Sequence, residues 1–411
     1  MRKTTLWRKL FKPAIFAAAI GVALPMLTST QASADPKQFS ALIAMGSDTT
    51  QSIIDALAGE SNGLVYLPIQ SSAASGSVQI ASWDAAGPDI PSPIDCITPK
   101  APGATIVRPV GSTNGRRALS RGILNEQWGG ASNCGASASS SGKNPSGLIN
   151  IARSSSKNGT AGTDLAYLPF ARDAVTFATY CNGCAGGVVN TFTAAQLLTI
   201  FSTSGVHTFG GHDVQACGLQ TGSGTYSFWN TALGNSTGNE ATATAACNAA
   251  GSAARLEEHD SDGLKAKGDS AAMLGKQVVV AMGVAPFISQ WNGLATDRTD
   301  PAVDLGIISD VSASKPYNGT IGAAPPASPL LTPVAAFAQN ATFGRDVFNV
   351  IDNLIIVNGG NNDYKTLLVG GTSVICSSAA QSRVQLFGFV SLSSGCGVAT
   401  TSAFQSGNAP S

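Results

Sequence analysis

The chain has 411 residues, of which 43% are hydrophobic and 12% are charged, and its 24 Lys and Arg residues balance 24 Asp and Glu residues. Because the chain has no excess of basic residues, its charge argues against nucleic acid or an anionic lipid surface as a partner. A chain of this length exceeds one hydrophobic core and predicts two lobes, and its 46 glycines indicate many loops on that scaffold.

Residues 1–34 have the parts of a secretory signal peptide. Basic residues between Arg2 and Lys12 precede an apolar stretch over Pro13–Leu27, and Ala32–Ala34 offers the small residues of a cleavage site. Cleavage would remove five basic residues and leave 19 against 24 acidic ones, a formal charge of −5. No later stretch approaches the roughly 18 uncharged residues of a transmembrane helix. We therefore expect a periplasmic or secreted protein without a lipid anchor or membrane insertion.

Apolar periodicity predicts strands that alternate with helices along the mature chain. The predicted strands are Phe39–Met45, Leu64–Ile69, Leu148–Ala152, Leu165–Leu168, Ala174–Thr179 and Gln277–Val284. The predicted helices are Gln51–Ala58, Gly115–Ile123, Ala194–Phe201 and Tyr226–Leu233. This alternation indicates an α/β fold in which each lobe is a mostly parallel sheet flanked by helices.

All eight cysteines lie in the mature part of the chain, at positions 96, 134, 181, 184, 217, 247, 376 and 396. An even number in an exported chain predicts up to four disulfides. The Cys181–Cys184 pair favours a structural loop disulfide over a redox pair, because no thioredoxin-like sequence surrounds it. Cys217–Cys247 and Cys376–Cys396 are plausible local bridges, but the spacing leaves the full connectivity open.

Three short Gly-Ser/Thr turns stand before residues with helical apolar spacing. They are GSDTT at Gly46–Thr50, GSTNG at Gly111–Gly115 and GSGT at Gly222–Thr225. A helix N-terminus offers unpaired backbone N–H groups and a partial positive charge, and Ser or Thr hydroxyls add donors there. Ligands of α/β sheets bind at the carboxyl ends of strands, where these turns are expected. Three such turns that meet at one point would form an oxyanion site.

The order of these motifs resembles the phosphate-binding protein of ABC importers, which has a type 2 periplasmic-binding-protein fold. The resemblance runs from Ala41 to about Asn292, in short blocks. Besides the three turns, these blocks are Arg108–Gly115, Ile149–Ser155, Leu165–Thr179, Thr191–Phe201 and Asp260–Gly263. Together the blocks are fairly specific, although each alone would be weak.

The resemblance implies a two-lobed protein that holds phosphate in the cleft between its lobes. Lobe one would comprise 35–173 and 345–411, and lobe two would comprise 174–344. The expected partners are inorganic phosphate and the membrane complex of an ABC importer. We expect a monomer without catalytic activity, cofactor or metal.

The resemblance also implies a set of phosphate ligands. Its usual Arg falls at Leu219 and its usual Asp at Ser155, so we infer from spacing that Arg153 and Asp48 supply these charges. Arg would bond the anion bidentately, and Asp48 would accept the proton of hydrogen phosphate, which sulfate lacks. Carried over by position, Ser47, Asp48, Thr49, Ser112, Ser223, Gly224 and Thr225 would contact phosphate, and Thr113 and Ser155 stand within the same blocks.

Other interpretations remain open at each of these positions. A Ser, Thr or Asp before a helix is usually an N-cap, and Arg153 could pair with Asp164 or Asp173 while Arg108 serves as a reserve ligand. A hydrolase would use Ser223 with His207, His212 or His259, but the GxSxG pattern is not met. His207 and His212 lack neighbours that would complete a metal site. A secreted adhesion or matrix protein on the same fold is a further alternative.

Overall fold

The computed structural model describes residues 42–58, 80–85, 96–100, 103–129, 134, 143–251, 254–359, 362–392 and 394–408. The expected signal peptide and the expected strand Leu64–Ile69 lie outside the described residues. All described residues belong to one compact unit, Ser33–Ser411. Within the described ranges, no helix has the length and apolar character needed to cross a bilayer.

Strands and helices alternate through the first half of the described chain, as the apolar periodicity predicts. The strands are β1 (Leu42–Gly46), β2 (Ile80–Ser82), β3 (Cys96–Ile97), β4 (Ile106–Val107), β5 (Ile151–Ser154), β6 (Leu165–Cys181), β7 (Thr191–Phe192), β8 (His207–Phe209), β9 (His212–Ala216), β10 (Gln277–Gly283), β11 (Asp304–Leu305), β12 (Ile307–Ile308), β13 (Tyr317–Asn318), β14 (Thr332–Pro333), β15 (Gly344–Asp352) and β16 (Thr400–Ser402). The helices are α1 (Gln51–Ala58), α2 (Gly111–Ile123), α3 (Ala194–Ser202), α4 (Gly224–Leu233), α5 (Thr237–Ala243), α6 (Ala245–Asn248), α7 (Ser261–Gly268), α8 (Val284–Trp291), α9 (Ala335–Ala338), α10 (Leu354–Val357), α11 (Asn362–Leu368) and α12 (Ser378–Leu386), with a 3-10 helix at Val374–Cys376.

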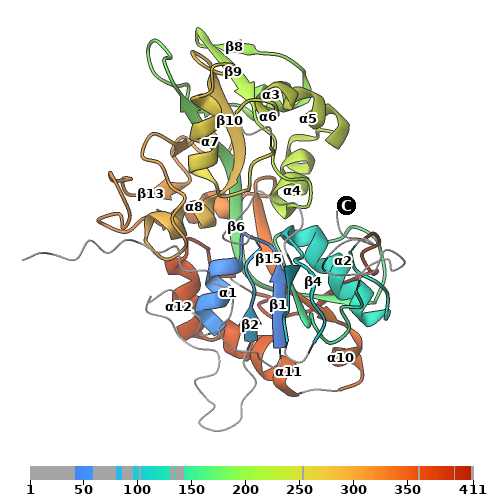
Figure 1. The fold of residues 1–411 in the computed structure, drawn as a ribbon. Helices are drawn as coiled ribbons and strands as arrows, with labels where there is room; N and C mark the ends of the chain where they lie inside the picture. The colour runs from blue at the N-terminus through green and yellow to red at the C-terminus, as the bar shows by residue number, and fades with distance from the viewer. Residues whose placement is uncertain are drawn as a thin grey trace, which may run out of the picture. The chain divides into compact units, whose positions relative to one another are not determined.

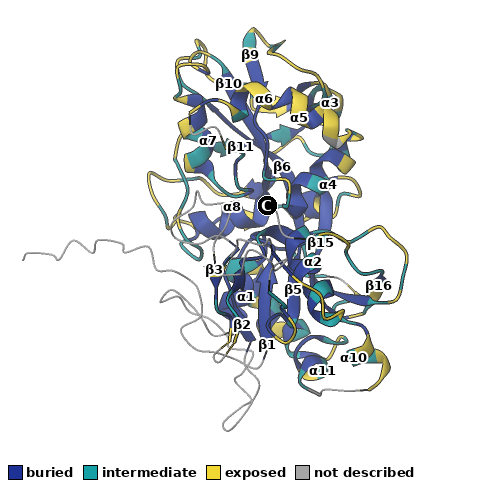
Figure 2. Cartoon of the chain, turned by 45° about the vertical axis from the view of Figure 1, so that its right-hand side comes forward, coloured by how far each residue is buried: buried dark blue, intermediate teal, exposed yellow. Residues whose placement is uncertain are grey.

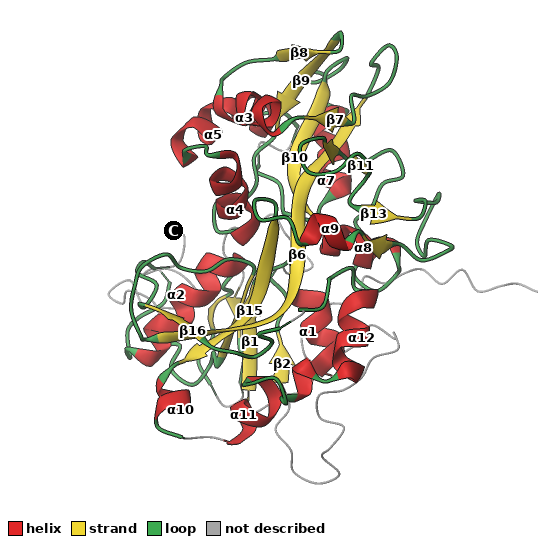
Figure 3. Ribbon diagram, turned by 180° about the vertical axis from the view of Figure 1, so that it is seen from behind, coloured by secondary structure: helices red, strands yellow, loops and turns green. Residues whose placement is uncertain are grey.

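Ten strands of the described chain join in one mixed sheet, in which β6 runs beside β15 and β10 (Figure 1). The order is β2-β1-β5-β15-β6-β10-β9-β8, and β11 and β16 also pair with β6. β1 pairs in parallel with β2 and β5, and β10 pairs in parallel with β9. The pairs of β6 with β10, β11, β15 and β16 are all antiparallel. The prediction of mostly parallel sheets is therefore wrong, because β6 and β15 are long antiparallel neighbours within the sheet. Helices flank the strands on both sides (Figure 3).

Strand β6 is continuous over 17 residues where the sequence predicts two strands, Leu165–Leu168 and Ala174–Thr179. Pro169 stands between the two predicted strands and has no N–H to donate to a neighbour. In the structure the register of β6 with β15 shifts between Val347 and Phe348, and Phe348 lies opposite Pro169. An irregularity of this kind is a β-bulge, which lets a proline lie within a paired strand.

Apolar side chains of the described residues gather in three buried clusters. One draws on residues from Ala174 to Phe343, and the other two draw on the strands and helices around β1, β5 and β15. Figure 2 shows the central strands as buried, while the outer helices α3 and α5 carry exposed residues. The predicted division into lobes stays a prediction, since the chain from Ser33 onward is one compact unit.

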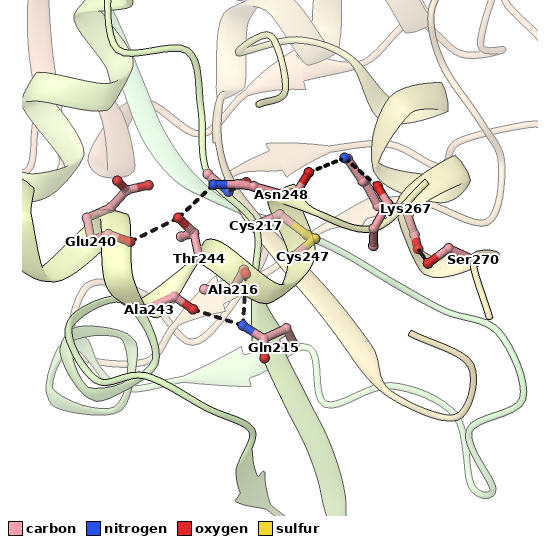
Figure 4. Close-up of a disulfide and its surroundings, with 12 residues drawn as sticks. Gln215, Ala216, Cys217, Glu240, Ala243, Thr244, Cys247, Asn248, Lys267 and Ser270 are labelled. Atoms are coloured by element: carbon pink, nitrogen blue, oxygen red, sulfur yellow. Dashed lines mark hydrogen bonds between the residues drawn. A yellow bond between two sulfur atoms is a disulfide. The ribbon is translucent and has the colours of Figure 1, made fainter. Parts of the chain in front are cut away.

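The eight described cysteines form four disulfides: Cys96–Cys134, Cys181–Cys184, Cys217–Cys247 and Cys376–Cys396. The loop disulfide and both predicted local bridges are confirmed. Disulfides are rare in cytosolic proteins, so this set is typical of a chain that folds outside the cytoplasm. Around Cys217–Cys247, Lys267 donates to the carbonyl oxygen of Asn248 at 3.0 Å (Figure 4).

Replacing both Cys217 and Cys247 with Ser is expected to lower the free energy of unfolding by about 2–4 kcal/mol, because the bridge closes a long loop of the unfolded chain. The two cysteines are buried and 30 positions apart. The matched control is the half-buried Cys181–Cys184 pair, which is 3 positions apart. Its double Ser variant should lose only about 1–2 kcal/mol in urea unfolding. Equal losses in the two variants would contradict the loop-closure argument.

Candidate functional site

The three predicted turns lie against one another. The hydroxyls of Ser47 and Ser112 are 3.3 Å and 3.2 Å from the hydroxyl of Ser155, and the backbone N–H of Ser155 donates to Ser112 at 3.0 Å. The backbone N–H of Thr113 donates to the carbonyl oxygen of Gly222 at 3.2 Å. The second turn therefore contacts the first through Ser155 and contacts the third directly, as the oxyanion hypothesis requires.

Two glycines let these turns approach closely. A Cβ at Gly224 would lie 2.4 Å from the hydroxyl oxygens of both Ser112 and Ser155, so any other residue there would have to displace these two hydroxyls. A Cβ at Gly111 would lie 2.4 Å from the carbonyl oxygen of Gly222, and the φ of Gly111 is +82°. Helix α2 begins at Gly111, four residues before the predicted start, so its first turn is part of the contact.

The side chain of Glu258 occupies the donors of the first and third turns. Its Oε1 accepts from the backbone N–H of Thr49 at 2.9 Å and from the Thr49 hydroxyl. Its Oε2 accepts from the Ser223 hydroxyl and from the backbone N–H of Thr225 at 3.3 Å. Glu258 is almost fully buried. A carboxylate of the protein itself is thus bound where the sequence predicts an oxyanion.

Ser223 combines two roles that the sequence left as alternatives. It is the N-cap of α4, because its side chain accepts from the backbone N–H groups of Thr225 and Tyr226. Its hydroxyl also donates its proton to Glu258. Within the described chain, no His is hydrogen-bonded to Ser223, and His207 lies instead 3.1 Å from the carbonyl oxygen of Thr203. This geometry gives the hydrolase hypothesis no support.

Arg345 supplies the guanidinium of the site. It lies on β15, and its Nε and one terminal nitrogen donate to Asp173 at 3.2 Å and 2.8 Å. The same terminal nitrogen donates to the Thr49 hydroxyl at 3.2 Å, and the guanidinium lies 5.4 Å from the ring centroid of Phe228. Burial raises the pKa of Glu258, but the charge of Arg345 and the hydrogen bonds from Ser223, Thr49 and Thr225 outweigh it and hold the pKa below its usual value. Glu258 is therefore bound as an ionised carboxylate.

Arg153 is fully buried at the end of β5 and binds other parts of the protein. It donates to the carbonyl oxygen of Trp83 at 2.6 Å, to that of Ser47 at 3.2 Å and to the Ser82 hydroxyl. Its salt-bridge partner is Asp55, at 4.0 Å, and not Asp164 or Asp173. Burial lowers the pKa of Arg153, and Asp55 opposes this shift. Contact of Arg153 with an anion stays a prediction.

Asp48 lies beside the donors but faces another group. Its Oδ2 accepts from the side-chain amide of Gln220 at 2.8 Å and lies 4.0 Å from Nδ1 of His259. Burial raises the pKa of Asp48 well above its usual value, and the negative charges of Glu258 and Glu257 raise it further. The predicted contact of Asp48 with phosphate stays a prediction, whereas Glu258 is the carboxylate that the donors of the two turns bind.

A cavity of about 570 Å³ adjoins the donor cluster. Thr113, Ser155 and Arg345 line it, together with the basic side chains of Arg116 and Lys157. Arg116 is buried and donates to the Ser154 hydroxyl and to the carbonyl oxygen of Ser156. Arg108, the predicted reserve ligand, donates instead to the carbonyl oxygen of Asp84 at 2.8 Å. The cavity gives an anion a positively charged approach to the turns.

Sequence reasoning missed Glu258 and Arg345. Glu258 belongs to the run Glu257–Asp260, which is conspicuous in a chain with 12% charged residues. Arg345 is the second residue of β15 and stands directly before Asp346. Both residues can be seen in the sequence, but neither stands beside one of the three Gly-Ser/Thr turns.

No protein-family model matches the chain, and no curated protein matches its sequence. Solved structures are similar to it at low identity. A putative phosphate ABC transporter substrate-binding protein with bound phosphate from Clostridium perfringens is 12% identical, with a TM-score of 0.46 over 85% of this chain and 99% of that one. An ABC-type phosphate transport receptor from Vibrio cholerae is 12% identical, with a TM-score of 0.44 over 85% of this chain and 99% of that one. PstS from Borrelia burgdorferi is 15% identical, with a TM-score of 0.36 over 86% of this chain and 99% of that one.

Proposed function

We propose that the chain is an exported solute-binding protein that captures inorganic phosphate, as hydrogen phosphate, for an ABC importer. The observation that carries the proposal is the set of donors around Glu258. Thr49, Ser223 and Thr225 already hold a buried carboxylate with two backbone N–H groups and two hydroxyls. Such donors at a helix N-terminus suit any compact oxyanion, including phosphate.

Phosphate would replace Glu258 at these donors. It has four oxygens where a carboxylate has two, so it would also reach the hydroxyls of Ser47, Ser112 and Ser155, which meet beside Gly224. Arg345 would balance its charge, since one terminal nitrogen of Arg345 is buried without a hydrogen-bond partner among the described residues. The neighbouring basic cavity supplies the route of entry.

The proposal also places the site between two lobes. In the division 35–173 plus 345–411 and 174–344, Thr49 and Arg345 belong to lobe one, whereas Ser223, Thr225 and Glu258 belong to lobe two. Glu258 would then hold the lobes together without phosphate by bonding Thr49. We propose a monomer that acts in the periplasm or outside the cell and has no catalytic activity.

Removing the Ser223 hydroxyl is expected to weaken phosphate binding by up to about tenfold. A hydrogen bond to a charged group contributes about 1.5–3 kcal/mol, and the loss of the same bond to Glu258 in the phosphate-free protein offsets part of this. Isothermal titration of phosphate-free mature protein should show about 1:1 binding for the wild type and weaker binding for Ser223→Ala. Ser236→Ala is the matched control, since Ser236 is the N-cap of α5 and is exposed. Absence of heat with folded wild type, or equal affinity in Ser223→Ala, would refute the proposal.

The Glu258 contact also favours a second candidate. If the carboxylate fills the donors permanently, the chain is a secreted adhesion or matrix-type protein that keeps the fold without a ligand. Folded wild type would then give no heat with phosphate, and Ser223→Ala would lose stability alone.

A further inference from the structure

A cluster of metal-ligand side chains lies beside the donors and has no part in the proposed phosphate site. Asp48, Glu257 and His259 each offer one ligand atom, and these atoms lie within 4.8 Å of one another. An ion would take one nitrogen of His259. Nδ1 lies 4.0 Å from Asp48 Oδ2, and Nε2, on the other side of the ring, lies 3.8 Å from Glu257 Oε2. Small side-chain movements would bring all three to one ion.

Two buried atoms of this cluster are unsatisfied. The Asp48 side chain is 0% exposed, and its Oδ1 has no hydrogen-bond partner among the described residues. Nδ1 of His259 likewise has none within the described chain. Unpaired buried polar atoms are rare in native proteins, because each costs about 1–3 kcal/mol. An ion bound between them would satisfy both.

The surroundings leave room and charge for a cation. Asp48 and His259 line a cavity of about 30 Å³, which is large enough for an ion or a water molecule. Arg298 pairs with Glu257 at 2.6 Å, and Gln220 donates to Asp48, so both carboxylates are oriented as metal-bound carboxylates commonly are. Among the described residues, His259 is the basic side chain that lies within salt-bridge distance of Asp48, at 4.0 Å.

We propose that Asp48, Glu257 and His259 bind one divalent transition-metal ion of the zinc class. An imidazole nitrogen with two carboxylate oxygens suits Zn²⁺, whereas Ca²⁺ and Mg²⁺ prefer oxygen ligands alone. These three side chains are not among the donors that hold Glu258, but Asp48 directly precedes Thr49 and Glu257 and His259 flank Glu258. The proposal is therefore tested without phosphate, in the state in which Glu258 fills the donors.

The test is a titration of chelator-treated, phosphate-free mature protein with Zn²⁺ against a chromophoric chelator. The wild type should bind about one equivalent, and His259→Gln and Asp48→Asn should each weaken binding at least about tenfold. His212→Gln is the matched control and should bind as the wild type does, because His212 lies on β9 outside the cluster. Circular dichroism checks that each variant is folded.

A second measurement uses the wild type alone. Anomalous scattering at the zinc edge should place the ion among Asp48, Glu257 and His259. No zinc binding, an ion at another place, tighter binding of Ca²⁺ than of Zn²⁺, or unchanged zinc affinity in folded His259→Gln would each overturn the proposal.

Discussion

Arg345→Met is expected to lower the free energy of unfolding by about 3–5 kcal/mol, because removing one partner leaves buried charge uncompensated. Arg345 is nearly buried and pairs with Asp173, which is also buried, and its charge stabilises the ionised Glu258. Met keeps much of the side-chain volume and removes only the charge and the donors. Urea unfolding monitored by circular dichroism measures the loss, and phosphate binding should fall below detection in the folded variant.

The matched control is the neighbouring rung of the same ladder. Arg345 of β15 lies opposite Asp173 of β6, and the next residue, Asp346, lies opposite Arg172. The arginine is therefore on β15 in the first pair and on β6 in the second. The Arg172 and Asp346 side chains are 27% and 35% exposed, and exposed pairs contribute about 0–1 kcal/mol. Arg172→Met should therefore cost little. A similar loss in both variants would contradict the view that burial makes Arg345 important.

Much of the fold is predictable where the signal is local. Helix α1 has the predicted bounds, and α3 extends the predicted Ala194–Phe201 by one residue, because apolar spacing marks their buried faces. Strand β6 is read as two because Pro169 interrupts the pattern, and only pairing with β15 makes it continuous. Whether two strands pair in parallel or antiparallel depends on the tertiary fold, and the local sequence pattern does not encode it.

The turns of the site are predictable for the same reason, since each is a short local motif. The charges are not. Asp48 lies within the first turn and Arg153 lies within one of the sequence blocks of the resemblance, so the sequence predicts that they supply the charges. In the structure the donors of the turns bind Glu258, and the Thr49 hydroxyl contacts Arg345. Thr49 and Glu258 are 209 positions apart, and Thr49 and Arg345 are 296 apart. Only the folded sheet brings them together, so spacing from the turns could not select them.

Glu258→Gln is expected to raise the affinity for phosphate about 10–100-fold, which corresponds to about 1.4–2.7 kcal/mol. In the wild type, phosphate must displace an anion that four hydrogen-bond donors hold. A Gln side chain has no charge, and its amide NH₂ would face donors of Thr49 or of Ser223 and Thr225, to which it cannot offer an acceptor. The competing occupant is thereby weakened while the donors remain. Isothermal titration of phosphate-free protein measures the change.

The control must lose a buried carboxylate without touching the donors. Glu240 is nearly buried and pairs with Arg255 at 3.0 Å, and Glu240→Gln makes the same chemical change there. Both variants should lose stability by about 1–3 kcal/mol, because each breaks charged hydrogen bonds, but only Glu258→Gln should bind phosphate more tightly. Unchanged phosphate affinity in folded Glu258→Gln would show that this carboxylate does not limit binding. Weaker affinity would show that Glu258 contacts the bound anion and accepts its proton, so that displacement by phosphate would be the wrong description of the site.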